Sequence, residues 1–428
     1  MSVSQTAGNA QRAAGSPRVR LTLGLCAAAA LLEGFDNQSM GVAAPRLFLE
    51  FSIAPSQGGI IFSAATFGLL FGALIGGRMS DYLGRRQTLT ISLWLFGVCS
   101  LLTSVAHSAQ MVLISRLLTG FGCGGAMPAF ISMASEAVTS SRRLSAVTLV
   151  MAALPFGGAL AGVMALGDLL GWGWRSIFIV GGAIPIAVAS AIPVLFRGSP
   201  ESERRAPPRP SRALPPQGVS AVLWGERRAG TTALLWCGFF FTQLILFLML
   251  NWLPSLIVGM GFSRSEASVT SIGFNLAGGL GAVLLARCHA GARRRLWVVT
   301  TYGGIAAALL GLTALASVGR AFPAALIASA VAGVFIVGAQ LILFALAPLY
   351  YPNDGRGTGV GVAVAVGRLG SVLGPLYAST LLAAGGSSAA VLAAIVPFVL
   401  LGGAAALGLT WRPQASNEQR SPSAAEAP

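Results

Sequence analysis

Residues 21–45 read LTLGLCAAAALLEGFDNQSMGVAAP, and this stretch decides the fold class. It is long and apolar enough to cross the ~30 Å hydrocarbon core of a bilayer as a helix. It nevertheless carries two carboxylates, Glu33 and Asp36, near its middle. Because a charged side chain at that depth is costly unless it faces a partner or a water-filled cavity, we expect both carboxylates to be functional.

The composition of the whole chain is that of a protein with many membrane spans. Of its 428 residues, 55% are hydrophobic, only 10% are charged and 55 are glycine, a mixture outside the range of soluble domains. Apolar stretches of about 20 residues, the length of a membrane-crossing helix, predict an all-α membrane protein with twelve transmembrane helices. They lie at 21–44, 57–77, 88–106, 110–133, 144–166, 175–196, 231–258, 267–287, 296–317, 321–346, 357–383 and 388–411.

Arginine sets the predicted orientation, because the chain has 28 basic residues and none of them is lysine. With a cytoplasmic N-terminus, 22 arginines fall on the cytoplasmic side, and only Arg46, Arg175, Arg264 and Arg320 fall outside. This asymmetry follows the positive-inside rule. It predicts a multi-pass protein of the cell inner membrane with both termini in the cytoplasm. It also explains the net charge of +15 without nucleic-acid binding.

A segment rich in proline and arginine, residues 197–230, divides the twelve spans into two sets of six. We expect this segment to be a cytoplasmic linker with little fixed structure. A polar turn leads into the fifth span of each set, SEAVTSSRRLSAV in the first and LYYPNDGRGTGV in the second. The sequence therefore predicts two pseudo-symmetric six-helix bundles, as in transporters with internal repeats. The predicted segments are a disordered tail 1–20, bundles 21–196 and 231–411, and a disordered tail 412–428.

Glycine spacing in the second span predicts close helix packing. Gly68, Gly72 and Gly76 form a double G-x-x-x-G pattern. Small residues at this spacing let two helix backbones approach one another in a membrane.

Glu33 and Asp36 are the only acidic residues predicted to lie deep in a span. They are three positions apart and therefore project from one face of the helix. Desolvation and mutual repulsion favour a bound proton on at least one of them near neutral pH, as proton coupling requires. The alternative is a permanently ionised carboxylate that pairs with an arginine for structural reasons.

Two arginines, Arg116 in the fourth span and Arg368 in the eleventh, are predicted to lie inside the membrane. Arginine keeps its charge, so each needs either a span-one carboxylate or an anionic substrate as its partner. We expect Arg368 to hold a substrate carboxylate, with a structural salt bridge as the alternative. Gln243 also lies in a span, but Asn251 and Gln340 are the stronger amide candidates because a buried amide needs a partner. The further candidate substrate-binding residues are Asn37, Asn251, Trp252 and Gln340.

The turn after the second span reads GGRMSDYLGRRQTL, and its glycines permit a tight bend. Together with twelve spans, this loop resembles the hallmark of the major facilitator superfamily. The resemblance implies a gating role for Gly77, Asp81, Gly84, Arg85 and Arg86. Residues 116–120, RLLTG, resemble the span-four motif of that family. The resemblance implies that Arg116 takes part in proton coupling with Asp36 and Glu33.

Four longer stretches narrow the resemblance: LLEGFDNQSMGVAAP, LLTGFGCGGAMP, LNWLPSLIVGMGFS and FALAPLYYPNDGRGTGVGVAVAVGRLGSVLGPL. Together they resemble the aromatic acid:proton symporters, in particular the branch that transports 3-phenylpropionate and 3-(3-hydroxyphenyl)propionate. This implies import of an aromatic carboxylic acid with protons by alternating access. A proton-coupled exporter of drugs or aromatic compounds is the alternative. The short PFGG at 155–158, without the longer glycine series of the exporter motif, argues weakly against it.

Other classes fit the sequence less well. The chain has two histidines, His107 and His289, both near loops, and we expect neither an enzyme nor a metal or cofactor. Direct ATP coupling through a phosphate-binding loop would need a lysine, and the chain has none. The sequence does not distinguish a transporter from a sensor with the same fold. The expected partners are a small aromatic carboxylate, protons and membrane lipid, and we expect a monomer.

Overall fold

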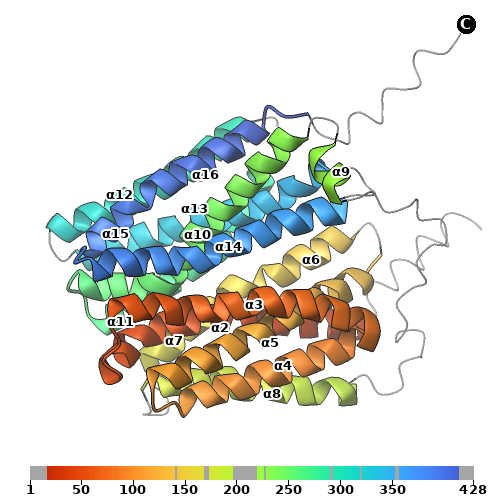
Figure 1. The fold of residues 1–428 in the computed structure, drawn as a ribbon, viewed down its shortest axis with the longest axis horizontal. Coiled ribbons are helices and arrows are strands. Elements are labelled where there is room, and N and C mark those ends of the chain that lie inside the picture. The colour runs from red at the N-terminus through yellow and green to blue at the C-terminus, as the bar shows by residue number, and fades with distance from the viewer. Residues whose placement is uncertain are drawn as a thin grey trace, which may run out of the picture. The chain divides into compact units, whose positions relative to one another are not determined.

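The computed structural model describes residues 17–139, 142–167, 173–195, 219–225, 228–289, 293–318, 321–351 and 356–413. Regular secondary structure in these ranges is helical, and no strand occurs in them (Figure 1). The predicted all-α class is therefore confirmed.

The first six predicted spans correspond to seven helices. They are α2 (Pro17–Glu50), α3 (Pro55–Leu83), α4 (Arg85–Ser104), α5 (Ala109–Glu136), α6 (Arg143–Met151), α7 (Ala153–Gly167) and α8 (Arg175–Leu195). Helices α6 and α7 form one span that is interrupted at Ala152, just before Pro155. Proline lacks the N–H that would continue the helical hydrogen bonds, which explains the interruption.

The last six predicted spans follow a short helix, α9 (Val219–Trp224). They are α10 (Ala229–Gly259), α11 (Arg264–His289), α12 (Arg294–Val318), α13 (Phe322–Leu346) with the 3-10 turn η3 (Ala347–Leu349), α14 (Arg356–Ala383), and the pair α15 (Ser388–Ala394) and α16 (Val396–Leu409). In the described part of the chain, eleven helical segments are long and apolar enough to cross a membrane. The twelfth span is α2, whose carboxylates and neighbouring amides lower its hydropathy.

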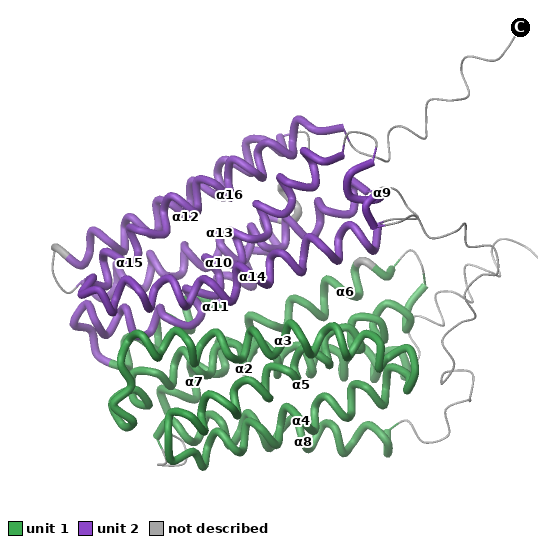
Figure 2. The backbone as a smooth tube through the Cα atoms, viewed as in Figure 1, with its two compact units in different colours: residues 1–207, 264–275 green, residues 208–263, 276–428 purple. Residues whose placement is uncertain are grey.

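The chain divides into two compact units (Figure 2). Unit 1 contains Met1–Pro207 and Arg264–Asn275, and unit 2 contains Pro208–Ser263 and Leu276–Pro428. Helix α11 is thus divided, with its first half in unit 1 and its second half in unit 2. The segment boundaries expected from the sequence stay a prediction.

The predicted linker and tails fall mostly outside the described residues. One described part of the linker differs from the expectation of little fixed structure, because residues 219–224 form α9. Its sequence, VSAVLW, is mostly apolar, and Val222 and Leu223 are buried in the core of unit 2. Burial of these two side chains explains why this end of the linker is ordered.

The same helix pairs recur in both units. In unit 1, α2 packs along α7 and α4 packs along α8. In unit 2 the corresponding first and fifth spans, α10 and α14, pack together, as do the third and sixth, α12 and α16. This repetition agrees with the predicted pseudo-symmetry of two six-helix sets.

Close packing of α3 against α5 depends on glycine. At Gly68, Gly72 and Gly76, backbone atoms of Leu117, Phe121 and Gly125 stand where a Cβ atom would be. The predicted packing role of these three glycines is confirmed, because any larger residue would push the helices apart.

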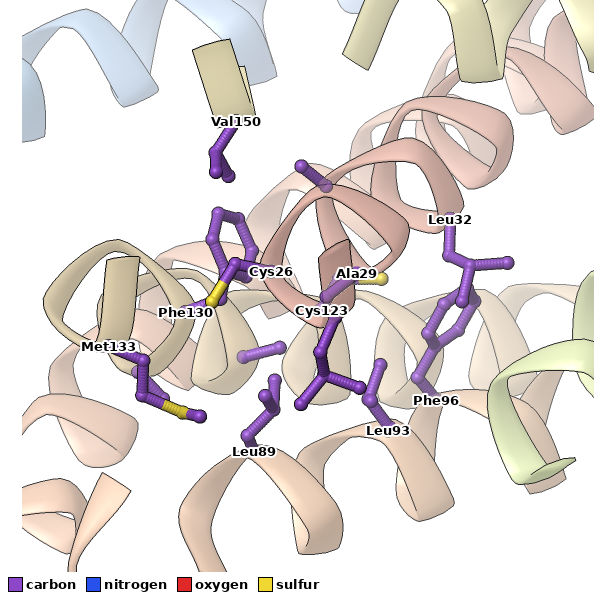
Figure 3. Packing of buried hydrophobic residues seen from close by; sticks show 14 of the residues in the cluster. Cys26, Ala29, Leu32, Leu89, Leu93, Phe96, Cys123, Phe130, Met133 and Val150 are labelled. Carbon is purple, nitrogen blue, oxygen red and sulfur yellow. The ribbon is translucent and has the colours of Figure 1, made fainter. Parts of the chain in front are cut away.

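The core of unit 1 includes side chains from α2, α3, α4, α5, α6 and α8, and Figure 3 labels residues on α2, α4, α5 and α6. Leu32 of α2, Phe96 of α4 and Phe130 of α5 are almost completely buried there. The cluster fixes α2 and α5 relative to one another. It therefore fixes the two helices that carry Asp36 and Arg116.

Candidate functional site

Asp36 and Arg116 form a buried ion pair inside unit 1. Nη2 of Arg116 donates to Oδ1 of Asp36 at 2.6 Å and to Oδ2 at 2.5 Å. The Arg116 side chain is 0% exposed and that of Asp36 is 5% exposed. Removing either partner would leave a buried charge without compensation, which is strongly unfavourable.

The close contact of Gly34 with α7 explains why the Asp36 side chain faces α5. Gly34 lies two positions before Asp36, and residues two apart on a helix point to nearly opposite sides. The backbone of Leu154, in α7, occupies the place where a Cβ atom of Gly34 would be. Since Gly34 faces α7 so closely, Asp36 faces the other way, where Arg116 meets it.

Two further side chains contact the pair. The thiol of Cys123 lies 3.9 Å from Oδ2 of Asp36 and is placed to donate a weak hydrogen bond. The ring centroid of Phe178 lies 5.4 Å from Cζ of Arg116, within cation–π range. Neither residue could be predicted as part of the site from the sequence, because thiols and phenyl rings are common in apolar helices and do not indicate a function there.

The guanidinium of Arg116 is only partly satisfied. Its Nη2 makes both contacts with Asp36, while its Nε and Nη1 are buried and have no hydrogen-bond partner among the described residues. Glu33 is also buried, 3% exposed, one turn before Asp36 on α2. Because residues three apart lie on one face of a helix, Glu33 lies in the same neighbourhood as the pair.

Gln38 and Asn275 form a second buried polar contact in unit 1. Nδ2 of Asn275, in the first half of α11, donates to Oε1 of Gln38 at 2.9 Å and to its own helix at Ser271. Asn37, which the sequence nominated, is half-buried beside Gln38. Asn275 was missed, although it too is an amide within a predicted span and therefore needs a partner.

In unit 2 the candidate residues lie on three helices. Arg368 is near the middle of α14 and 8% exposed, and Gln340 is half-buried on α13. On α10, Nε1 of Trp252 donates to the carbonyl of Pro375 at 3.0 Å, and Nδ2 of Asn251 donates to that of Phe247 at 2.8 Å. These bonds fix the orientation of the indole and of the amide.

The predicted gating loop lies between α3 and α4. Gly84 has a φ of 86°, a conformation that favours glycine, and it ends α3 and begins α4. Arg85 forms an ion pair with Glu136 at the end of α5. Asp81 is exposed, and its charge acts on Arg85. Arg86 is half-buried and Gly77 has open space around its Cα.

The candidate residues of the two units include a buried ion pair, a second carboxylate, amides, an indole and a further guanidinium. No group of three or more His, Cys, Asp or Glu side chains in the described ranges is placed to hold a metal ion.

Comparison with known proteins identifies the family. The sequence model described as Major Facilitator Superfamily matches residues 26–375. The chain is 39% identical to the 3-(3-hydroxy-phenyl)propionate transporter of Escherichia coli (strain K12), over 93% of this chain and 95% of that protein. It is 30% identical to the gallate transporter of Pseudomonas putida, over 85% of each.

Solved structures agree with this at the level of the fold. A bacterial homologue of the human lysosomal transporter Spinster matches 93% of this chain and 100% of that chain, with a TM-score of 0.76 and 19% identity. The xylose transporter XylE from E. coli matches 94% of this chain and 99% of that chain, with a TM-score of 0.71 and 16% identity. The chain therefore belongs to the major facilitator superfamily and is a multi-pass membrane transport protein rather than an enzyme.

Proposed function

We propose that the chain imports an aromatic carboxylic acid together with protons by alternating access. Relatives that are 39% and 30% identical are named for the transport of 3-(3-hydroxy-phenyl)propionate and of gallate, both of which are aromatic carboxylates. This supports a substrate of the same class here. The transporter acts as a monomer in the inner membrane. Both of its termini lie in the cytoplasm, the orientation that the arginine distribution predicts.

The buried Asp36–Arg116 pair carries the proton-coupling part of the proposal. When Asp36 is ionised, Arg116 holds it at 2.5–2.6 Å. Protonation of Asp36 cancels its charge, whereas Arg116 keeps its own. Arg116 then needs a new anionic partner, and buried Glu33, one turn away on α2, is the nearest carboxylate along that helix. A proton on Asp36 thus changes which carboxylate Arg116 binds.

Arg368 carries the substrate part of the proposal. It is a buried cation near the middle of a membrane helix, and its planar fork suits a carboxylate. Asn37, Asn251, Trp252 and Gln340 are the further proposed contacts. Binding of one monoanion with one proton makes the transport cycle electroneutral.

The gating loop has a structural part in this scheme. Gly84 sets the bend between α3 and α4, and Arg85 ties α4 to α5 through Glu136. Asp81, Arg86 and Gly77 complete the loop. We assign it to control of conformational change rather than to substrate contact.

Uptake of labelled 3-phenylpropionate and 3-(3-hydroxyphenyl)propionate by cells that express the chain tests the proposal. We expect accumulation that a protonophore abolishes. Arg368→Ala should lose uptake and Arg368→Lys should retain part of it, while Arg264→Ala, at an exposed position of α11, should behave as wild type. Exclusion of either acid from energised cells would instead indicate an exporter, and unchanged affinity in both Arg368 variants would remove this residue from the site.

A further inference from the structure

Helices α10 and α13 bring two glutamine side chains to one level of unit 2. Helices α10, α11, α12 and α13 are consecutive spans, and each crosses the membrane in the direction opposite to the one before it. Helices α10 and α13 therefore run in opposite directions. The rings of Phe239 and Phe344 meet between them with centroids 5.3 Å apart. One turn further along α10 is Gln243, and one turn back along α13 is Gln340. The two amides therefore extend from about the same level of the two helices.

Gln243 also adjoins the turn of α14 that carries Arg368. Helices α10 and α14 pack closely at Gly370 and Gly374, where carbonyl oxygens of α10 occupy the places of Cβ atoms. At Gly367 a Cβ atom would lie 3.2 Å from Cγ of Gln243. Arg368 is the next residue and is itself buried. Three helices of unit 2 thus carry two amides and one guanidinium on neighbouring turns.

Both amides have an unsatisfied oxygen. Gln243 is 2% exposed, and its Oε1 is buried with no hydrogen-bond partner among the described residues. The Oε1 of Gln340 is likewise buried and has no hydrogen-bond partner among the described residues. Buried acceptors are nearly always paired, so two unpaired ones at one level are suited to a donor that a ligand supplies. A carboxylate cannot be that donor, because an ionised carboxylate only accepts hydrogen bonds.

We infer that a ring hydroxyl of the substrate donates its single proton to Oε1 of Gln243 and Oε1 of Gln340 in a three-centre hydrogen bond, while the substrate carboxylate pairs with Arg368. This inference rests on the proposed function and narrows it to hydroxylated aromatic acids. An aromatic acid without a ring hydroxyl still pairs with Arg368, but it leaves both amide oxygens unsatisfied. A site built to bond a hydroxyl discriminates against the analogue that lacks it. Gln243 is therefore a specificity-determining residue.

The test compares two ligands that differ only in the hydroxyl, 3-(3-hydroxyphenyl)propionate and 3-phenylpropionate. Their dissociation constants are measured by calorimetry on the purified full-length chain and its variants. We expect the wild type to bind the hydroxylated acid about tenfold more tightly, the ratio that one satisfied buried hydrogen bond gives. Gln243→Leu should bring the ratio close to one by weakening the hydroxylated acid alone, and Gln340→Leu should reduce it.

Gln110→Leu is the matched control, because Gln110 is exposed on α5, in unit 1; it should keep the wild-type ratio. If Gln243→Leu does not fold, Gln243→Asn, which withdraws the amide by one methylene, should lower the ratio in its place. A wild-type ratio near one, as expected if water satisfies both oxygens, overturns the inference, and so does a full ratio in the Gln243 and Gln340 variants. Failure of the wild type to bind either acid would instead overturn the proposed function.

Discussion

Breaking the Asp36–Arg116 pair should be much more costly than breaking a surface pair of similar length. The contacts of 2.5 and 2.6 Å and the exposed fractions of 0% and 5% place the pair in the fully buried class. In that class, removal of one partner costs about 3–5 kcal/mol. We expect Arg116→Met to lower the free energy of unfolding by this amount, and Asp36→Asn to lower it by less, because Glu33 then offers Arg116 a second carboxylate.

The double variant Asp36→Asn/Arg116→Met should cost less than the sum of the single changes, because neither Asp36 nor Arg116 then remains as a charge without its partner. The assay is reversible unfolding in detergent micelles, analysed as a double-mutant cycle. The pair Arg175–Glu50 serves as control, because its contact of 2.6 Å joins side chains that are 31% and 40% exposed. Its cycle should give a coupling energy of about 0–1 kcal/mol. Additive effects at Asp36 and Arg116, or a coupling no larger than that of the control, would refute the reasoning.

Two further predictions concern stability. Gly76→Ala should destabilise the protein by about 1–3 kcal/mol, because its methyl group would meet the backbone of Gly125. Neighbouring Gly77→Ala is the control and should stabilise the protein slightly, because its methyl group would enter open space. Equal shifts in melting temperature for the two variants would contradict the packing argument. Hydrogen bonds from Arg175, and secondarily from Trp174, lower the pKa of Glu50. The ionised Glu50 side chain therefore stabilises the protein above the ordinary carboxyl pKa, and this stabilisation is lost as the pH falls through the lowered pKa. Glu50→Gln should accordingly lower the melting temperature at neutral pH and lose its effect in acid, and an effect that persists at low pH would exclude this charge interaction.

The membrane helices and the candidate partners of the central ion pair could be predicted from the sequence for a simple reason. Lipid tolerates few charges, so a carboxylate and an arginine deep in spans have very few partners to choose from. Asp36 therefore had only Arg116 or Arg368 as candidates, and the structure pairs it with Arg116. The packing face of α3 could be predicted for a similar reason, since the spacing of its glycines specifies one close-packed side.

Features that depend on the register between distant helices could not be predicted. The sequence did not show that Gln243 lies near the level of Gln340, because that follows from the packing of Phe239 on Phe344. It did not show the bond from Asn275 to Gln38, because α11 reaches unit 1 only through tertiary contacts. In both cases the residue types indicated a need for a partner, but only the fold identifies which partner lies near.

Accumulation driven by a proton gradient tests the central claim most directly. The purified chain is reconstituted into liposomes, an inward proton gradient is imposed, and uptake of labelled 3-(3-hydroxyphenyl)propionate is followed for the wild type and for Asp36→Asn. We predict that the wild type accumulates the acid above its external concentration and that a protonophore abolishes this, whereas Asp36→Asn does not accumulate it. Undiminished accumulation by Asp36→Asn would contradict the assignment of Asp36 as the proton-coupling residue.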